Sequence, residues 1–202
     1  MPSLVLYGNR ESGHSYKVKL ALAVLGLAHE YRPVDLALKR DERPADFRAA
    51  SRFGEVPVLL IDGVPLAQSN AILAYLARTT GRLGGSLEPH RIDEWLFWEA
   101  NRIGFSLPNL RFAKVFAPAT PQEVVAWLAA RVHADLDRLD DELGRNEFLL
   151  GAAPTIADIA CCAYMFWPEQ AGIDLAAWQN VSRWLAAIRA TPGWKHPYQL
   201  LG

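Results

Sequence analysis

The sequence predicts an α/β domain followed by an all-helical bundle. Short strand-like apolar runs alternate with helical stretches in the first eighty residues, whereas only helical periodicity follows. The glycine-rich stretch 81–86 separates these two parts and is typical of a linker. A chain of 202 residues is long enough for two domains with cores of their own. We therefore place the domains at residues 1–80 and 87–202.

The first domain begins with a buried strand over residues 4–7, which Gly8 ends. A helix with one apolar face follows, and Gly26 is placed to end it in a left-handed conformation. Residues 29–34 are expected to form a second strand. A charged stretch then leaves room for one short helix, over residues 45–50.

A β-hairpin and a helix complete this domain. Residues 58–61 and 64–66 flank Asp62-Gly63, a dipeptide that favours the tight turn of a hairpin. A helix is expected over residues 69–77, with Gly81 beyond its end. The predicted order is therefore β-α-β-α-β-β-α.

The second domain carries helix-start signals. Thr120-Pro121-Gln122-Glu123 has the pattern of a capping box with proline at the first helical position, and the apolar repeat that follows runs to Gly144. Residues 155–158 start a helix that is apolar on every side and therefore buried, and Pro168 is expected to stop it.

Two further features of the second domain concern its first and last helices. Pro108 is expected to kink the first one, because proline removes a hydrogen bond inside a helix. Residues 178–190 have the pattern of a final amphipathic helix.

The composition excludes several classes of protein. The net charge is −1 and no block of lysine and arginine occurs, which argues against a nucleic-acid-binding protein. The longest uncharged apolar runs, 20–28 and 159–167, have about nine residues, too few to cross a bilayer. The N-terminus lacks the pattern of a secretory signal. The only cysteines, Cys161 and Cys162, are adjacent, which favours the reducing cytoplasm.

Familiar catalytic motifs are missing from the sequence. The five histidines are scattered, and neither HExxH nor CxxC occurs, so no metal site is expected. The sequence also lacks GxSxG, a Walker loop and GxGxxG. The sequence therefore carries none of the motifs that usually indicate a serine hydrolase, a nucleoside triphosphatase or a Rossmann-type dehydrogenase.

Three polar segments stand out in the first domain. Residues 7–18 form a strand, a polar loop and the start of a helix. Residues 53–59 place Pro57 where a strand should begin, and residues 66–72 place Gln68-Ser69 directly before a helix. Helix N-termini carry unpaired N–H groups, so two of these segments favour an anionic ligand.

The order and spacing of these segments resemble the soluble glutathione S-transferase superfamily, in particular its serine-type, bacterial-like members. The resemblance rests on Ser12 to Val18, on Gly54-Glu55-Val56-Pro57-Val58-Leu59, and on the run from Gln68 to Leu76. Thr155-Ile156-Ala157-Asp158 looks like the buried capping box of the family's helical domain. The resemblance implies a thioredoxin-like first domain, a helical second domain, a cytoplasmic homodimer and a role in detoxification.

The resemblance assigns thiol activation to the Ser12 hydroxyl, with Ser15 as a second candidate. A glutathione thiol has a pKa of ~8.5, so only about 3% is thiolate at pH 7. Lowering that pKa by about two units requires about 2.7 kcal/mol, which one or two hydrogen-bond donors can supply. Ser12 is also a good helix cap without any catalytic role. Tyr7 is the rival donor, although its place inside the strand favours packing.

Other residues are implied to bind glutathione as a co-substrate, with no metal. Pro57 is implied to be cis, so that the Val56 backbone can pair with the peptide as an added strand does. Gln68 and Ser69 are implied to hold the γ-glutamyl carboxylate, and Arg43 or Arg40 the glycine carboxylate. His14 lies beside the thiol loop. The implied set is Ser12, His14, Arg43, Val56, Pro57, Gln68 and Ser69.

The second substrate is expected to be a small apolar electrophile. The resemblance places it against the first helix of the second domain, where the candidate residues are Trp98, Arg102, Phe105 and Arg111. An aromatic stripe of this kind is also typical of a helix core.

Departures from the family pattern leave alternatives open. Gly13 and His14 replace two residues of the loop found in maleylacetoacetate isomerases, which argues against that activity, and no CPxC cysteine is present. A glutathione-dependent peroxidase or disulfide-bond reductase remains an alternative. So does a non-catalytic binding module, because fold alone does not determine function.

Overall fold

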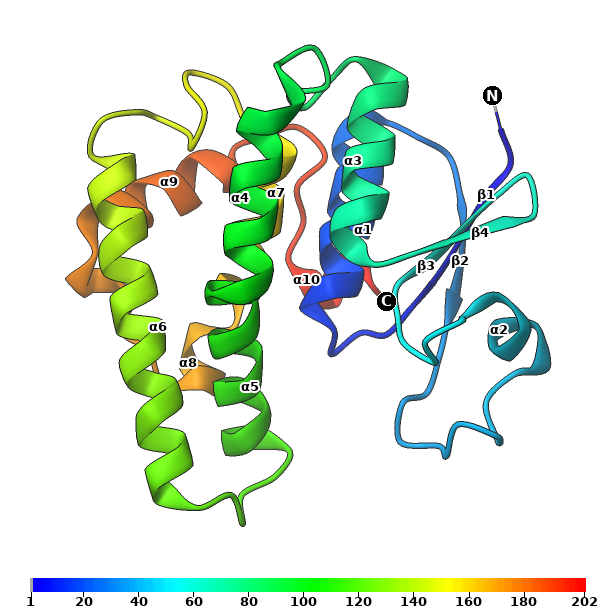
Figure 1. Ribbon diagram of the computed structural model, residues 1–202, viewed down its shortest axis with the longest axis horizontal. Coiled ribbons are helices and arrows are strands. Elements are labelled where there is room, and N and C mark those ends of the chain that lie inside the picture. Colours follow the sequence, from blue (N-terminus) through cyan, green and yellow to red (C-terminus); the bar gives the residue numbers. More distant parts are fainter. Residues whose placement is uncertain (1) are drawn as a thin grey trace. The chain divides into compact units, whose positions relative to one another are not determined.

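The computed structural model describes residues 2–202 and divides them into two compact units (Figure 1). The first contains the chain up to Gly85 together with Pro192–Gly202, and the second is Ser86–Thr191. The helical domain predicted over residues 87–202 thus differs at its end. Its last residues return to the first unit.

A sheet of four strands forms the centre of the first unit. The strands are β1 (Leu4–Gly8), β2 (Glu30–Pro33), β3 (Val58–Ile61) and β4 (Val64–Ala67), in the spatial order β2-β1-β3-β4. Strand β1 is parallel to β2 and antiparallel to β3, which forms a hairpin with β4. Asp62 and Gly63 have φ angles of 49° and 83°, as a tight hairpin turn requires. The predicted hairpin is confirmed.

Helices cover both faces of this sheet. Helices α1 (Gly13–Leu25) and α3 (Ser69–Thr80) run side by side, and α2 (Ala45–Ala50) lies on the other face (Figure 1). Because successive strand residues point to opposite faces, Tyr7 packs on Phe47 of α2 while Leu6 points toward the opposite side. Gly26 ends α1 with a φ angle of 69°, as its position predicted. The thioredoxin-like class is confirmed.

The last residues of the chain form a strap along α1, residues 192–202 including α10 (Pro197–Leu200). Gly193 has a φ angle of 90°, and a Cβ there would lie 2.7 Å from the carbonyl oxygen of Ala23. Further along, the Tyr16 hydroxyl donates to the Lys195 carbonyl oxygen at 2.9 Å. At the start of α1, the Tyr198 hydroxyl donates to the Glu11 carboxylate at 2.8 Å. The strap therefore follows α1 back to the loop that precedes it.

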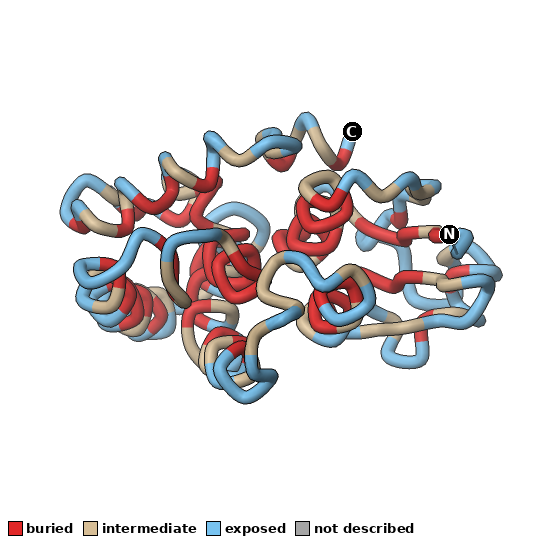
Figure 2. Tube along the Cα trace, turned by 90° about the horizontal axis from the view of Figure 1, so that it is seen from above, coloured by how far each residue is buried: buried red, intermediate tan, exposed pale blue. Residues whose placement is uncertain are grey.

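The second unit consists of helices. They are α4 (Pro89–Asn101), α5 (Ile103–Val115), α6 (Gln122–Leu143), α7 (Ile156–Cys162), η1 (Ala163–Phe166), α8 (Pro168–Ala171), η2 (Leu175–Ala177) and α9 (Gln179–Arg189). Every residue of α7 is buried, as its apolar sequence predicted. Figure 2 shows buried stretches inside each unit and exposed connecting loops.

The first helix of this unit breaks at Arg102 rather than at Pro108. Arg102 has φ and ψ angles of −116° and −106°, whereas Pro108 lies within α5. The Glu99 side chain is buried, and its carboxyl group packs directly against Gly104. A Cβ at position 104 would overlap this carboxyl group, so only glycine fits there. The helix expected to be one kinked element is therefore two helices, α4 and α5, and Pro108 lies inside the second.

Two cap predictions had different outcomes. The Thr155–Asp158 capping box is present, with Thr155 accepting from Ala157 and Asp158 accepting from Thr155. The one expected at Thr120 is not formed: Pro121 takes the cap position of α6, no side chain caps it, and the Thr120 hydroxyl donates to the Ala117 carbonyl oxygen. Pro168 begins α8 and follows a 3₁₀ turn, rather than directly ending the buried helix.

Across residues 2–202, none of the helices has both the length and the apolar character needed to span a membrane.

Candidate functional site

The register of the sheet brings the three polar segments to one edge. Tyr7 of β1 pairs with Val58 of β3, and Val58 pairs with Ala67 of β4. The loop after β1, the residues before β3 and the residues after β4 therefore leave the sheet side by side. Helices α1 and α3 both begin at this edge (Figure 1). Two helix N-termini and one extended segment thus form a single site.

Asn9 holds the loop between β1 and α1. Its side-chain amide donates to the Val34 carbonyl oxygen at 2.8 Å, and its side-chain oxygen accepts from the Glu11 N–H at 2.8 Å. Its backbone carbonyl accepts from the Ser12 N–H at 3.0 Å, and its own N–H donates to the Ser15 hydroxyl at 3.1 Å. Ser15, in the first turn of α1, therefore has a structural role in holding the loop. Asn9 was missed, although asparagine between strand and helix is a typical turn signal.

Ser12 caps α1 and keeps its own hydrogen available. The hydroxyl oxygen accepts from the Ser15 N–H at 3.1 Å, and the residue is 9% exposed. Among residues 2–202 the Ser12 hydroxyl has no acceptor for its own proton. A hydroxyl can accept and donate at the same time. Capping and donation to a ligand atom are therefore compatible here.

Tyr7 has its hydroxyl on the opposite face of the sheet. It donates to the Asp46 carboxylate at 2.7 Å and accepts from the Arg32 guanidinium at 2.9 Å. Burial, together with the hydrogen bond to Asp46, raises the pKa of Tyr7. The ring lies 5.6 Å from that of Phe47. The hydroxyl of Tyr7 is thus part of a packed network, which favours Ser12 as the donor.

His14 lies in the first turn of α1, next to Ser12. Burial, with a smaller effect of the Lys17 charge, lowers the pKa of His14 to about 3. The imidazole is therefore neutral throughout the physiological range. It adds no positive charge to the site.

We expect this neutral histidine to make folding sensitive to acid. The unfolded chain takes up a proton at a pKa of ~6.5, whereas the folded chain does so only near about 3. Because the unfolded state then binds more protons, the free energy of unfolding should fall by about 2 kcal/mol between about pH 7.5 and pH 5. Urea unfolding at both pH values measures this loss, which His14→Asn should reduce. His90→Asn, at an exposed position, is the control; an equal effect of both variants contradicts the prediction.

The Val56-Pro57 peptide bond is cis, as the resemblance implied. Val56 is half-buried and lies two residues before the start of β3. Its backbone therefore lies at the same edge as the start of α1.

Gln68 and Ser69 form an open helix start. Gln68 precedes α3 with a φ angle of 71°, a conformation rare outside glycine, and its side chain makes no cap hydrogen bond. Ser69 is 8% exposed, and its hydroxyl contacts no hydrogen-bond partner within residues 2–202. Serine is thus the first residue of the helix rather than its cap. The free N–H groups and the hydroxyl suit a carboxylate.

Arg43 spans two loops of the first unit. Its guanidinium donates to the carbonyl oxygens of Gly54 at 2.8 Å, Leu36 at 3.2 Å and Leu38 at 3.2 Å. Arg40 lies over Gly54, where a Cβ would be 3.3 Å from its Nε. Arg43 therefore has a structural role, and contact of either arginine with a glycine carboxylate stays a prediction.

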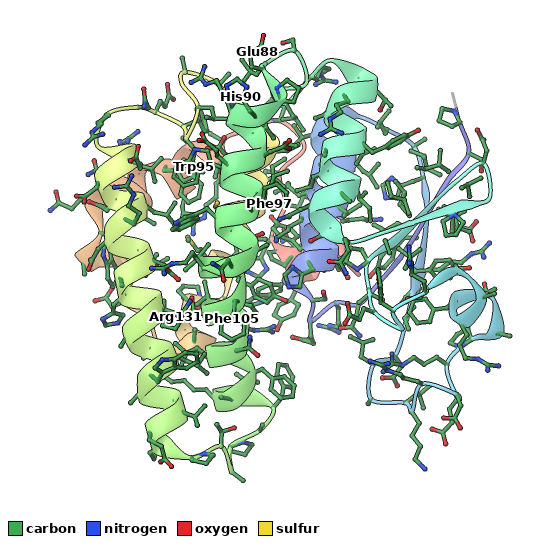
Figure 3. All side chains as sticks on the ribbon, in the orientation of Figure 1. Glu88, His90, Trp95, Phe97, Phe105 and Arg131 are labelled. Carbon is green, nitrogen blue, oxygen red and sulfur yellow. The ribbon has the colours of Figure 1, made fainter. Side chains whose placement is uncertain are left out.

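The four substrate candidates of the second unit have separate surroundings. Trp98 packs edge-on against Trp95, with ring centroids 5.4 Å apart. Arg102 donates to the buried Asp135 carboxylate at 2.9 Å. Phe105 is 42% exposed and lies beside Arg131 of α6 (Figure 3).

Arg111 is the most buried of the four, with 3% of its surface exposed. Its guanidinium stacks on the Trp167 ring at 4.3 Å and donates to Gln170 at 2.7 Å. The structure therefore gives Arg102 and Arg111 internal partners and leaves Phe105 as the exposed aromatic candidate. Contact with a substrate stays a prediction for all four.

Within residues 2–202, histidine, cysteine and carboxylate side chains form no group with the geometry to hold a metal ion. Cys161 and Cys162 are both buried in α7.

Comparison with known families identifies both units. The family model for the N-terminal domain of glutathione S-transferases matches residues 2–78, and the model for the C-terminal domain matches residues 105–192. The chain is 34% identical to maleylacetoacetate isomerase of Rhizobium meliloti over 86% of this chain and 85% of that protein. It is 31% identical to the disulfide-bond oxidoreductase YfcG of Escherichia coli over 89% and 87% of the two chains.

Solved structures agree with these matches. The crystal structure of a glutathione S-transferase from Pseudomonas fluorescens superposes with a TM-score of 0.87 at 31% identity, covering 96% of this chain and 98% of that one. The fold, both family models and relatives above 30% identity thus lead to one conclusion: the chain belongs to the glutathione S-transferase family.

Proposed function

We propose that this protein binds glutathione and activates its thiol for attack on a small apolar electrophile. The observation that carries the proposal is the Ser12 hydroxyl, which caps α1 and keeps its proton available at the helix N-terminus. A hydroxyl that donates to sulfur, together with the positive end of a helix, favours the thiolate over the thiol. The thiolate is the reactive nucleophile.

The other segments of this edge suit the rest of the tripeptide. The Val56 backbone offers an N–H and a C=O to the cysteinyl residue, as a strand edge does. Gln68 and Ser69, at the N-terminus of α3, suit the γ-glutamyl carboxylate. Arg40 or Arg43 would face the glycine carboxylate, and Phe105 with Trp98 would contact the electrophile. We expect a cytoplasmic homodimer.

Calorimetric titration of glutathione tests this assignment. We expect a dissociation constant in the micromolar to millimolar range and about tenfold weaker binding by Ser69→Ala, which loses one hydrogen bond to a charged group. Ser182→Ala, whose hydroxyl donates to the Leu175 carbonyl oxygen in the second unit, is the control and should bind as the wild type does. If the wild-type protein binds no glutathione, the proposal is wrong.

Glutathione-dependent disulfide reduction is the second candidate. A relative 31% identical is a disulfide-bond oxidoreductase, and both cysteines of this chain are buried. Because reduction of a disulfide consumes two thiols, two glutathione molecules would have to supply them. Mixed disulfides and aryl halides, offered in parallel, separate the two reactions: oxidised glutathione forms only in the reduction, and a thioether only in the transfer.

A further inference from the structure

A pocket with an excess of positive charge lies beside α2, in the first unit. It has a volume of about 310 Å³, and four arginines line it: Arg40, Arg43, Arg48 and Arg52. Asp41 is the one carboxylate that the structure describes in its lining, so the lining has a formal charge of +3.

Arg43 ties two segments of the chain together at this pocket. Its guanidinium donates to the carbonyl oxygens of Leu36 and Leu38 in one segment and of Gly54 in the other. Phe47, which also lines the pocket, is buried in the cluster that packs against the sheet. The pocket is therefore held in place by the fold.

The other three arginines are oriented but keep donors available. Arg48 uses only its Nε, which donates to the Arg43 carbonyl oxygen at 3.1 Å. Arg52 stacks on the Phe53 ring at 4.9 Å, and Arg40 packs on Gly54. Within residues 2–202, none of these three guanidinium groups has a carboxylate partner.

Nearby carboxylates are already engaged elsewhere. Asp46 binds the Tyr7 hydroxyl at 2.7 Å and the Arg32 guanidinium at 3.0 Å. Glu42 accepts from the Lys39 N–H at 3.2 Å. Neither of these two carboxylates therefore forms an ion pair with an arginine of the pocket.

We infer that this arginine pocket binds a small dianion of the phosphate monoester class. Guanidinium groups match phosphate oxygens in geometry, and three of them, from the loop before α2, from α2 and from just after it, suit a tetrahedral group whose oxygens point apart. A carboxylate, in contrast, can be bound by one guanidinium group through two parallel hydrogen bonds. The volume leaves room for a small organic group on the ester oxygen.

Calorimetry with phenyl phosphate as the probe tests the inference. We expect submillimolar binding at about pH 8, where the probe is a dianion, and at least tenfold weaker binding of phenyl sulfate, a tetrahedral monoanion. The double variant Arg48→Gln/Arg52→Gln should weaken phenyl phosphate binding at least tenfold. Arg145→Gln, an exposed arginine of the second unit, should leave it unchanged. No heat with phenyl phosphate, or equal losses in both variants, overturns the inference.

A second titration, with glutathione at saturation, separates this pocket from the proposed thiol site. Retained phenyl phosphate binding supports a separate site. Displacement of the probe by glutathione overturns the inference and assigns the pocket to the glycine end of the tripeptide. If glutathione does not bind at all while phenyl phosphate does, the proposed function is wrong and the pocket stands.

Discussion

Replacement of Ser12 by alanine should raise the pKa of the bound glutathione thiol by about two units and lower kcat/KM about 100-fold. The variant removes the hydroxyl that caps α1 and whose proton is available to sulfur. Loss of one donor to a developing or resident anion typically lowers rates by about 100- to 1,000-fold. The ultraviolet absorbance of the thiolate, followed against pH in the binary complex, measures the pKa directly.

Two matched variants show whether the hydroxyl itself is responsible. Ser12→Thr keeps a hydroxyl and a cap, and should retain most of the shift in thiol pKa. Tyr7→Phe removes the rival hydroxyl, which binds Asp46 and Arg32, and should leave the thiol pKa unchanged. If Tyr7→Phe raises the thiol pKa while Ser12→Ala does not, the hydroxyl that donates to the glutathione sulfur is that of Tyr7 and not that of Ser12.

Replacement of Asp158 by alanine should lower the free energy of unfolding by about 3–5 kcal/mol. The carboxylate is fully buried and accepts hydrogen bonds from the Leu149 N–H, the Thr155 N–H and hydroxyl, and the Trp184 indole N–H. Alanine would leave all these donors buried without an acceptor, together with a cavity. Urea unfolding, followed by tryptophan fluorescence, measures the change.

Asp174→Ala is the matched control for this prediction. Asp174 also caps a helix of the second unit, but it is exposed and accepts only from the Ala176 N–H at 3.0 Å. Its loss should lower the free energy of unfolding by about 1 kcal/mol or less. Similar losses for the two variants would show that burial of the donors around Asp158 contributes little.

Local signals predicted most of the fold. Gly26 and the Asp62-Gly63 turn need backbone conformations that few residues adopt, so their positions fix where α1 ends and where β3 turns into β4. The site followed from the same kind of signal. Polar residues directly after β1 and directly before α3 lie at one sheet edge because the strand register requires it.

Features that depend on which partners the side chains find could not be predicted in this way. The break at Arg102 lies between Gly104 and the buried Glu99 carboxyl group that packs on it, a contact that sequence periodicity does not show. The Thr120 hydroxyl donates to the Ala117 carbonyl oxygen and caps no N–H group of α6, which the capping pattern alone did not reveal. The internal partners of Arg111 come from α8 and the residue before it.

The strap over α1 has a consequence for how the protein is made. Tyr198 binds Glu11, the neighbour of Ser12, so the loop that carries the proposed nucleophile-activating hydroxyl has a partner that follows the whole second unit in sequence. A ribosome translates the strands of the sheet first and residues 86–191 before it reaches this partner. The nascent first unit can therefore acquire its sheet early, but the hydrogen bond from Tyr198 to its thiol loop can form only after the second unit has been synthesised.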